Sequence, residues 1–343
     1  MAARSGGGGA RRGVTKVGTD DTSDGGRPPL RCLQVHVAAA NSSGNGNSQP
    51  RWMNPMSPFK LSSFDDSRIG RLDRPACALP QDPFLPSGRG SGRVLVLGHR
   101  GARGPERPDN SVAAVTEALL QGADGIEIDV RLTTDGTLVC AHDALALTRT
   151  GGRREVATSA SGELLDTGGR NALATLPELL AAVQHAPGTH VVVEAKPVTD
   201  RARMQPTADA VAAVLAAYAG NAVITVSSFD ADLLAMIRAA CADLPVRTAL
   251  LAETSDAADA IVARAAEDGH DEVHLPLVGL LRTPEAAATA YRHGLSVAVW
   301  GANRRPELEW VASLGVDAVI TDDILTAWSE LDRAVAVREM VAA

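Results

Sequence analysis

The sequence predicts an α/β fold, a (β/α)8 barrel, and two observations support this. From Val94 onward, short apolar runs rich in valine and isoleucine alternate with longer Ala-rich segments whose apolar residues recur at helical spacing. This alternation is typical of parallel β/α units. In addition, about 250 residues follow Arg93, a length that suits one barrel.

Each predicted element is a short apolar run or a periodic segment between turn residues. We expect strands at 94–98, 125–131, 190–195, 222–227, 246–251, 272–275, 295–300 and 317–321. We expect helices near 109–121, 175–186, 206–219, 230–241, 256–268, 283–293 and 304–314. Asp135-Gly136 is typical of a hairpin turn, so 138–142 is interpreted as a return strand outside the count of eight. The glycine-rich stretch 144–174 is expected to be a loop insertion and not a separate domain.

The chain is expected to divide into a tail and a barrel. Residues 1–93 carry 13 Lys+Arg against 7 Asp+Glu, a balance of +6, which leaves 20 against 34, or −14, for residues 94–343. Runs of glycine, asparagine and serine give the first segment too little apolar surface to offset chain entropy. We predict a disordered, low-complexity tail at 1–92, a barrel at 93–335 and the end of the last helix at 336–343.

Composition also bounds the compartment and the partners. No segment approaches the ~20 apolar residues of a membrane helix, so no stable membrane insertion is expected. The basic charges of the tail are too diluted to form a polybasic cluster, and no nucleic-acid partner is expected. Four cysteines without CxxC spacing imply no disulfides, which fits a soluble protein in the cytoplasm. The sequence leaves the oligomeric state unknown.

Acidic residues gather on predicted strands. Side chains two residues apart in a strand share a face, so Glu127 and Asp129 converge, as do Glu194 and Lys196. Three carboxylates on adjacent strands favour a hard divalent cation, Mg²⁺ or Ca²⁺, whereas the distant cysteines argue against zinc. The alternative is that the carboxylates are ion-pair partners of Arg100, Arg131 and Lys196.

Two histidines stand at strand ends near these acids. His99 and His142 can donate and accept protons near neutrality, as a general acid and base must. Arg100 and Lys196 can bind phosphoryl oxygens, or can serve as counter-ions of the acids. Trp300 is expected to form an apolar wall of the substrate site. Asp143 is expected to point away from His142, its neighbour in a strand, and the other histidines, His274 included, are assigned no role.

These residues, in this order, resemble the glycerophosphodiester phosphodiesterase family. The match runs from about Val94 to Ile324 and includes His99-Arg100-Gly101, Glu127-Ile128-Asp129-Val130, Thr133-Thr134-Asp135-Gly136, His142-Asp143 and Glu194-Ala195-Lys196. The chain has Asp109-Asn110-Ser111 where the family has Glu-Asn-Thr, and the shorter acid puts its contacts in doubt. Gly301 replaces a threonine in the late Trp-Thr-x-Asn motif, and Asp323-Ile324 stands where Tyr-Pro is frequent.

The resemblance implies a role for each matching position. It implies His99 and His142 as the acid/base pair, Arg100 and Lys196 as phosphate ligands, and Glu127, Asp129 and Glu194 as ligands of one divalent cation. It further implies hydrolysis of glycerophosphodiesters, small-molecule substrates, to sn-glycerol 3-phosphate and an alcohol through a cyclic phosphate. Two alternatives remain open: a lysophospholipase D or sphingomyelinase D-like enzyme acting on lysolipids, and a catalytically weak glycerophosphodiester-binding protein.

Overall fold

The structure, a computed structural model, describes residues 93–147, 152–165, 173–186 and 188–331. The predicted tail at 1–92 and the predicted helix end at 336–343 lie outside these residues. Within the described segments, no helix combines the length and the apolar character needed to cross a membrane.

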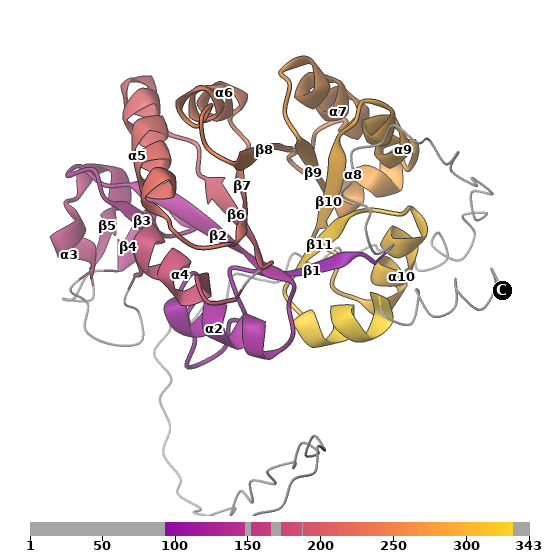
Figure 1. The fold of residues 1–343 in the computed structure, drawn as a ribbon, viewed down its shortest axis with the longest axis horizontal. Helices are drawn as coiled ribbons and strands as arrows, with labels where there is room; N and C mark the ends of the chain where they lie inside the picture. The colour runs from indigo at the N-terminus through magenta and orange to yellow at the C-terminus, as the bar shows by residue number, and fades with distance from the viewer. Residues whose placement is uncertain (1–92, 148–151, 166–172, 187, 332–343) are drawn as a thin grey trace, which may run out of the picture. The chain divides into compact units, whose positions relative to one another are not determined.

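A closed barrel of parallel strands forms the centre, as predicted (Figure 1). Its strands, in their order around the barrel, are β1 (Leu95–His99), β2 (Gly125–Leu132), β6 (His190–Ala195), β7 (Val223–Ser228), β8 (Val246–Leu251), β9 (Glu272–Pro276), β10 (Ser296–Trp300) and β11 (Ala318–Thr321). β1 pairs with both β2 and β11, which closes the sheet.

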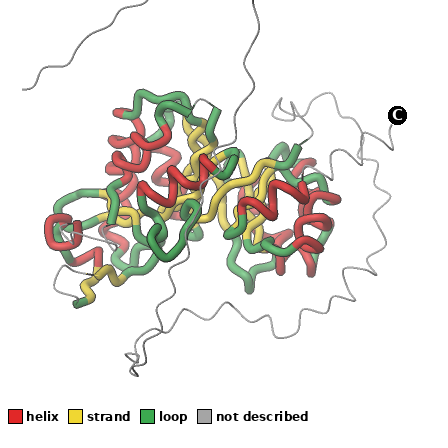
Figure 2. The backbone as a smooth tube through the Cα atoms, turned by 90° about the horizontal axis from the view of Figure 1, so that it is seen from below, coloured by secondary structure: helices red, strands yellow, loops and turns green. Residues whose placement is uncertain are grey.

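Helices lie outside the strands (Figure 2). They include α2 (Val112–Leu120), α4 (Leu176–Val183), α5 (Met204–Ala217), α6 (Ala231–Ala240), α7 (Ala258–Glu267), α8 (Leu277–Arg282), α9 (Glu285–Arg292) and α10 (Arg305–Ser313), and the short η2 (Arg201–Arg203) leads into α5. Residues 324–331 are helical as well. All of the predicted helices are present, and α8 is an addition. The helix expected at 109–121 begins only at Val112 because Ser111 caps it, accepting a hydrogen bond of 3.1 Å from the Ala114 amide.

The hairpin return is confirmed, whereas the insertion after it is more regular than predicted. β3 (Leu138–Cys140) runs antiparallel to β2. The insertion holds the hairpin of β4 (Leu145–Leu147) and β5 (Arg153–Glu155), then η1 (Val156–Thr158) and α3 (Ser161–Leu165). Val156 and Leu164 of the insertion are buried with Val139 of β3 in a small apolar cluster that is separate from the main core. These apolar side chains lie too far apart in sequence to form a periodic pattern, so they did not signal structure.

Alternation along β2 divides its side chains between two environments. Ile126 and Ile128 belong to the main apolar core, and Glu127 and Asp129 face the other side, as the period of two requires. A second apolar cluster contains Leu97, Val192, Ala298, Ala318 and Ile320. The barrel is therefore packed like a core, and its polar side chains collect at its ends.

A repeated turn connects helices to strands. In each case a glycine with positive φ ends the helix, and an aspartate two residues later accepts a hydrogen bond from a backbone amide of the preceding strand. The pairs are Asp124 with Val96 at 2.9 Å, Asp271 with Thr248 at 2.8 Å and Asp317 with Val297 at 2.8 Å. These side chains fix the register of neighbouring strands at the amino ends of the barrel.

The contact between β2 and β6 allows a test of the packing. A Cβ atom added to Gly125 would lie 2.0 Å from the main-chain oxygen of His190. We expect Gly125→Ala to lower the free energy of unfolding by about 3 kcal/mol, since backbone must move to relieve the clash. Gly162→Ala is the matched control, because no atom lies within 4 Å of its added Cβ. Equal denaturant midpoints for the two variants would contradict the close approach of Gly125 to the main chain of His190.

The two cysteines within the described residues, Cys140 and Cys241, are free and buried, in line with the expectation of no disulfides. Cys32 and Cys77 lie outside the described residues.

Candidate active site

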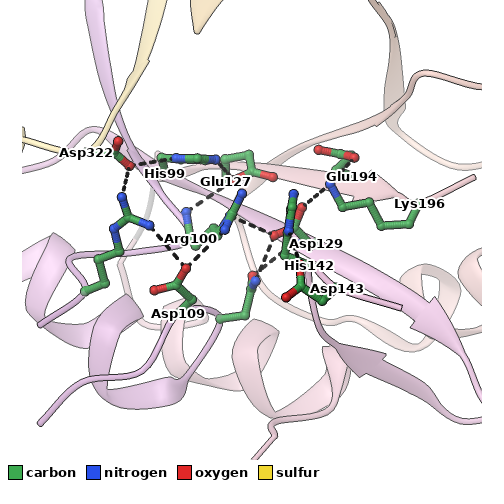
Figure 3. A network of polar contacts seen from close by, with 12 residues as sticks. His99, Arg100, Asp109, Glu127, Asp129, His142, Asp143, Glu194, Lys196 and Asp322 are labelled. Carbon is green, nitrogen blue, oxygen red and sulfur yellow. Dashed lines mark hydrogen bonds and ion pairs between the residues drawn. The ribbon is translucent and has the colours of Figure 1, made fainter. Parts of the chain in front are cut away.

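The carboxyl ends of the barrel strands surround a cavity of about 460 Å³. Parallel pairing places His99 beside Glu127 and Asp129 beside Glu194. The structure brings the predicted site residues together: His99, Arg100, Glu127, His142, Glu194, Lys196 and Trp300 line the cavity. Asp129 does not line it, but contacts both Arg100 and Lys196 (Figure 3).

Three buried carboxylates form the centre of the site. Glu127, Asp129 and Glu194 each offer one oxygen, and these oxygens lie within 4.8 Å of one another. Burial, and then repulsion from the two other acids, raises the pKa of Glu127 well above its usual value. Burial also raises the pKa of Glu194, to about 7. One buried oxygen of Glu127, Oε1, has no hydrogen-bond partner among the described residues. An all-oxygen set of ligands fits a hard divalent cation.

Asp129 differs from the two other acids because cations contact it directly. Lys196 Nζ lies 2.7 Å from its Oδ1, and Arg100 Nε lies 3.2 Å from its Oδ2. Burial by itself would raise the pKa of Asp129, but Lys196 and Arg100 outweigh that effect and lower the pKa to about 2. Lys196 also lies 2.6 Å from Glu194. The predicted ion pairs of Arg100 and Lys196 are therefore present in the same place as the predicted cation ligands, whereas Arg131 instead donates hydrogen bonds to the main-chain oxygen of His142.

The turn after β1 positions Arg100. Arg100 has a left-handed φ of 59°, and its amide donates a hydrogen bond of 3.2 Å to Glu127. Gly101, with φ of 82°, completes the turn, and a Cβ there would lie 2.6 Å from the backbone of Ala114. The turn thus needs both an arginine in a strained conformation and a glycine. The guanidinium of Arg100 contacts Asp129 and Asp109.

Each site histidine is held by a carboxylate through Nδ1. His99 Nδ1 lies 2.7 Å from Asp322 Oδ1, and His142 Nδ1 lies 2.8 Å from Asp143 Oδ1. Burial lowers the pKa of His142, and the charge of Lys196 lowers it further. The second ring nitrogen of His99, Nε2, lies 3.9 Å from Glu127 Oε2.

The expectation that Asp143 points away from His142 is wrong. β3 ends at Cys140, so His142 and Asp143 lie in a bend, where consecutive side chains need not point to opposite faces. The main-chain oxygen of His142 accepts hydrogen bonds from Arg131, which holds this bend in place.

Further residues, to which the sequence assigned no role, complete the network in Figure 3. Asp109, despite being one carbon shorter than glutamate, reaches Arg100 at 3.1 Å and Arg103 at 3.3 Å. Arg103 also lies 3.0 Å from Asp322, which links the two acids. In the late motif, Asn303 accepts hydrogen bonds from the Asp322 amide and the Thr321 hydroxyl, each at 2.8 Å. Gly301 has a φ of 83°, a conformation that a threonine rarely adopts.

Asn110 supports the acid cluster through two hydrogen bonds to Asp129. It is buried, its Nδ2 donates to Asp129 Oδ2 at 2.8 Å, and its Oδ1 accepts from the Asp129 amide at 2.9 Å. Its φ of 57° is one that asparagine tolerates better than most residues. The sequence alone did not reveal this left-handed conformation, which is seen only in the structure.

Two substitutions at Asn110 separate the hydrogen bonds from the backbone conformation. Asn110→Gly removes both hydrogen bonds to Asp129 but tolerates the positive φ, so unfolding free energy should fall by about 1–3 kcal/mol. Asn110→Ala should cost about 1 kcal/mol more, because Cβ opposes this backbone conformation. Denaturant titration measures both. An alanine variant as stable as the glycine variant would contradict the strained φ.

Comparisons with known proteins place the chain among related sequences. The model of the glycerophosphoryl diester phosphodiesterase family matches residues 99–326. The chain is 33% identical to the protein named "Probable glycerophosphodiester phosphodiesterase 1" of Mycobacterium tuberculosis over 254 residues, covering 66% of this chain and 88% of that protein.

Solved structures show the same fold. A glycerophosphodiester phosphodiesterase from Thermotoga maritima is 25% identical, with a TM-score of 0.55 and coverage of 69% of this chain and 97% of that one. A phosphodiesterase from Oleispira antarctica, solved with the product sn-glycerol-3-phosphate, is 21% identical, with a TM-score of 0.59 and coverage of 70% and 97%.

Proposed function

Because the chain belongs to the glycerophosphoryl diester phosphodiesterase family, we propose that it hydrolyses glycerophosphodiesters to sn-glycerol 3-phosphate and an alcohol, with a divalent cation and two histidines. Membership in this family makes the protein a phosphoric diester hydrolase. The product seen with the Oleispira antarctica phosphodiesterase supports the extension to this substrate class.

One observation carries the proposed mechanism: two carboxylate-held histidines line the same cavity as the acid cluster. With Nδ1 of His99 bonded to Asp322 and Nδ1 of His142 bonded to Asp143, each ring has a fixed orientation and presents Nε2. One histidine takes the proton of the attacking glycerol hydroxyl while the other protonates the leaving alkoxide. The roles exchange when water opens the cyclic phosphate.

The cations of the site serve the phosphate. Arg100 and Lys196 now neutralise Asp129 and Glu194. A divalent ion held by the three carboxylates would take over that neutralisation, lower the pKa of a coordinated hydroxyl and stabilise charge on phosphorus oxygens. The guanidinium fork and the ammonium group would then be available for the phosphoryl oxygens. Mg²⁺ and Ca²⁺ both suit this ligand set.

We further infer that residues 93–335 are the catalytic domain and that the protein works in the cytoplasm. Two buried free cysteines support a reducing compartment. The lysolipid enzyme and the binding protein are weaker candidates, since no contact in the described residues favours a lysolipid, and binding alone does not require two proton-transfer groups.

The cation should be required for turnover. We expect EDTA to abolish release of sn-glycerol 3-phosphate from glycerophosphocholine, and added Mg²⁺ or Ca²⁺ to restore it. Glu127→Gln keeps the shape of the side chain and removes one anionic ligand, so restoration should need about 10–100 times more cation. A coupled assay for sn-glycerol 3-phosphate measures both. EDTA-resistant activity in the wild type would count against the cation site.

His142 should be indispensable. His142→Ala removes an acid/base group and should lower kcat for glycerophosphocholine by at least ~10²-fold, with a smaller change in KM. His185→Ala is the matched control, because His185 is exposed and lies outside the cavity. A folded His142→Ala variant that keeps wild-type kcat would refute the acid/base role.

A further inference from the structure

A second cavity, of about 410 Å³, adjoins the cavity at the centre of the site. Its lining comes from η1 of the insertion and from the segment that leads into α5, and the insertion and α5 lie on the same side of the barrel (Figure 1). Arg131, Ala144, Lys196 and Pro197 line both cavities. Since Lys196 is one of the proposed phosphate ligands, a phosphodiester bound at the centre has room to extend one of its two alcohol portions into the second cavity.

Arg131, at the boundary of the two cavities, is a half-buried cation that makes no ion pair with the described residues. Its Nε and Nη2 donate to the main-chain oxygen of His142, at 3.1 and 2.7 Å. A guanidinium has five N–H donors, so both hydrogens of Nη1 and one hydrogen of Nη2 are left over. Nη1 and Nη2 together form a fork that binds a carboxylate or a phosphate through two parallel hydrogen bonds.

Arg203 adds a second cation to the lining of the same cavity. Its Nη2 donates to the main-chain oxygens of Leu132 and Thr133, at 2.8 and 3.0 Å, which holds it against the end of the strand that carries Arg131. Its Nε is buried and has no hydrogen-bond partner in the part of the chain that the structure describes. A desolvated cation without an anion costs free energy, so two partly desolvated cations on one cavity favour an anionic occupant.

The carboxylates of Glu155 and Asp200 line the second cavity as well. Both side chains are exposed, so solvent screens their charges. Asp200 also caps η2, accepting a hydrogen bond of 3.0 Å from the Ala202 amide. The guanidinium of Arg131 is less exposed than these two acids, and its charge therefore acts more strongly on a group in the cavity.

We propose that Arg131 binds an anionic group carried by the leaving alcohol, so that the protein prefers glycerophosphodiesters whose alcohol bears a carboxylate or a second phosphate. The inference rests on the proposed function and names a substrate class for it. The phosphodiester contacts Arg100 and Lys196 in the first cavity, and the alcohol extends past Lys196 into the second. An alcohol without an anionic group is still a substrate, but it leaves the fork of Arg131 without a partner.

Two matched pairs of substrates test the preference and separate its two sources. Glycerophosphoserine differs from glycerophosphoethanolamine by one carboxylate, and glycerophosphoinositol 4-phosphate differs from glycerophosphoinositol by one phosphate. For the full chain with Mg²⁺, kcat/KM should be about 10–100-fold higher for the anionic member of at least one pair, the gain expected from hydrogen bonds between charged groups. The pair that shows the gain identifies the anion. Serine and ethanolamine share their ammonium group, so any contact of that group with Glu155 or Asp200 cancels within the pair.

Substitutions locate the preference at Arg131. Arg131→Gln removes the charge and the fork, so the two members of a pair should become nearly equal substrates. A purely structural effect on the bend of His142 would instead lower kcat/KM of both members equally and leave their ratio unchanged. Arg201→Gln is the matched control, because Arg201 is exposed, pairs with Asp232 and does not line the second cavity. Its ratio should equal that of the wild type. If Arg131→Gln fails to fold, Arg131→Lys keeps the charge, loses the fork and should reduce the ratio.

Two results would overturn the anion site at Arg131: equal kcat/KM within both pairs for the wild type, or a ratio that Arg131→Gln leaves unchanged. Titration calorimetry of the same substrates with EDTA present distinguishes this failure from failure of the proposed function. If the anionic member binds about 10–100-fold more tightly but no substrate is hydrolysed with Mg²⁺ or Ca²⁺, the proposed function is wrong and the anion site stands. Equal affinities within both pairs, or no binding, would reject the anion site.

Discussion

Charge balance among three buried carboxylates is the constraint on which the site depends. Glu127, Asp129 and Glu194 lie on adjacent strands with oxygens within 4.8 Å, a density of negative charge that burial makes expensive. Lys196 and Arg100 neutralise Asp129, but Glu127 is left with a strongly raised pKa because burial and like charges act on it together. The divalent cation that we propose for this cluster would supply the further positive charge at the carboxyl ends of the barrel strands.

Much of the surrounding structure serves to hold these charges. The left-handed Arg100 brings its own amide to Glu127, and the left-handed Asn110 brings both groups of its amide to Asp129. Two non-glycine residues in a costly conformation thus support the same pair of acids. Asp109 and Asp322 extend the network through Arg103 to His99, so the first histidine and the acid cluster share one set of ion pairs.

The two halves of the barrel make different contributions to the cavity. β1, β2 and β6, with the bend after β3, supply the groups that we propose for proton transfer and phosphate binding. β7, β9 and β10 supply neutral polar atoms and an aromatic pair.

The sequence by itself determined the barrel and the charged core of the site. Regular alternation predicted all eight parallel strands, and the period of two placed Glu127 with Asp129, and Glu194 with Lys196, on shared faces. Only the tertiary structure decided the partners of the histidines. Asp322 lies 223 residues from His99, and Asp143 reaches His142 only because β3 ends at Cys140. The unpaired Nδ1 of His274 likewise depends on Glu272 taking its other nitrogen. The periodicity of a strand specifies which of its side chains share a face. It does not specify which distant residues will contact those side chains.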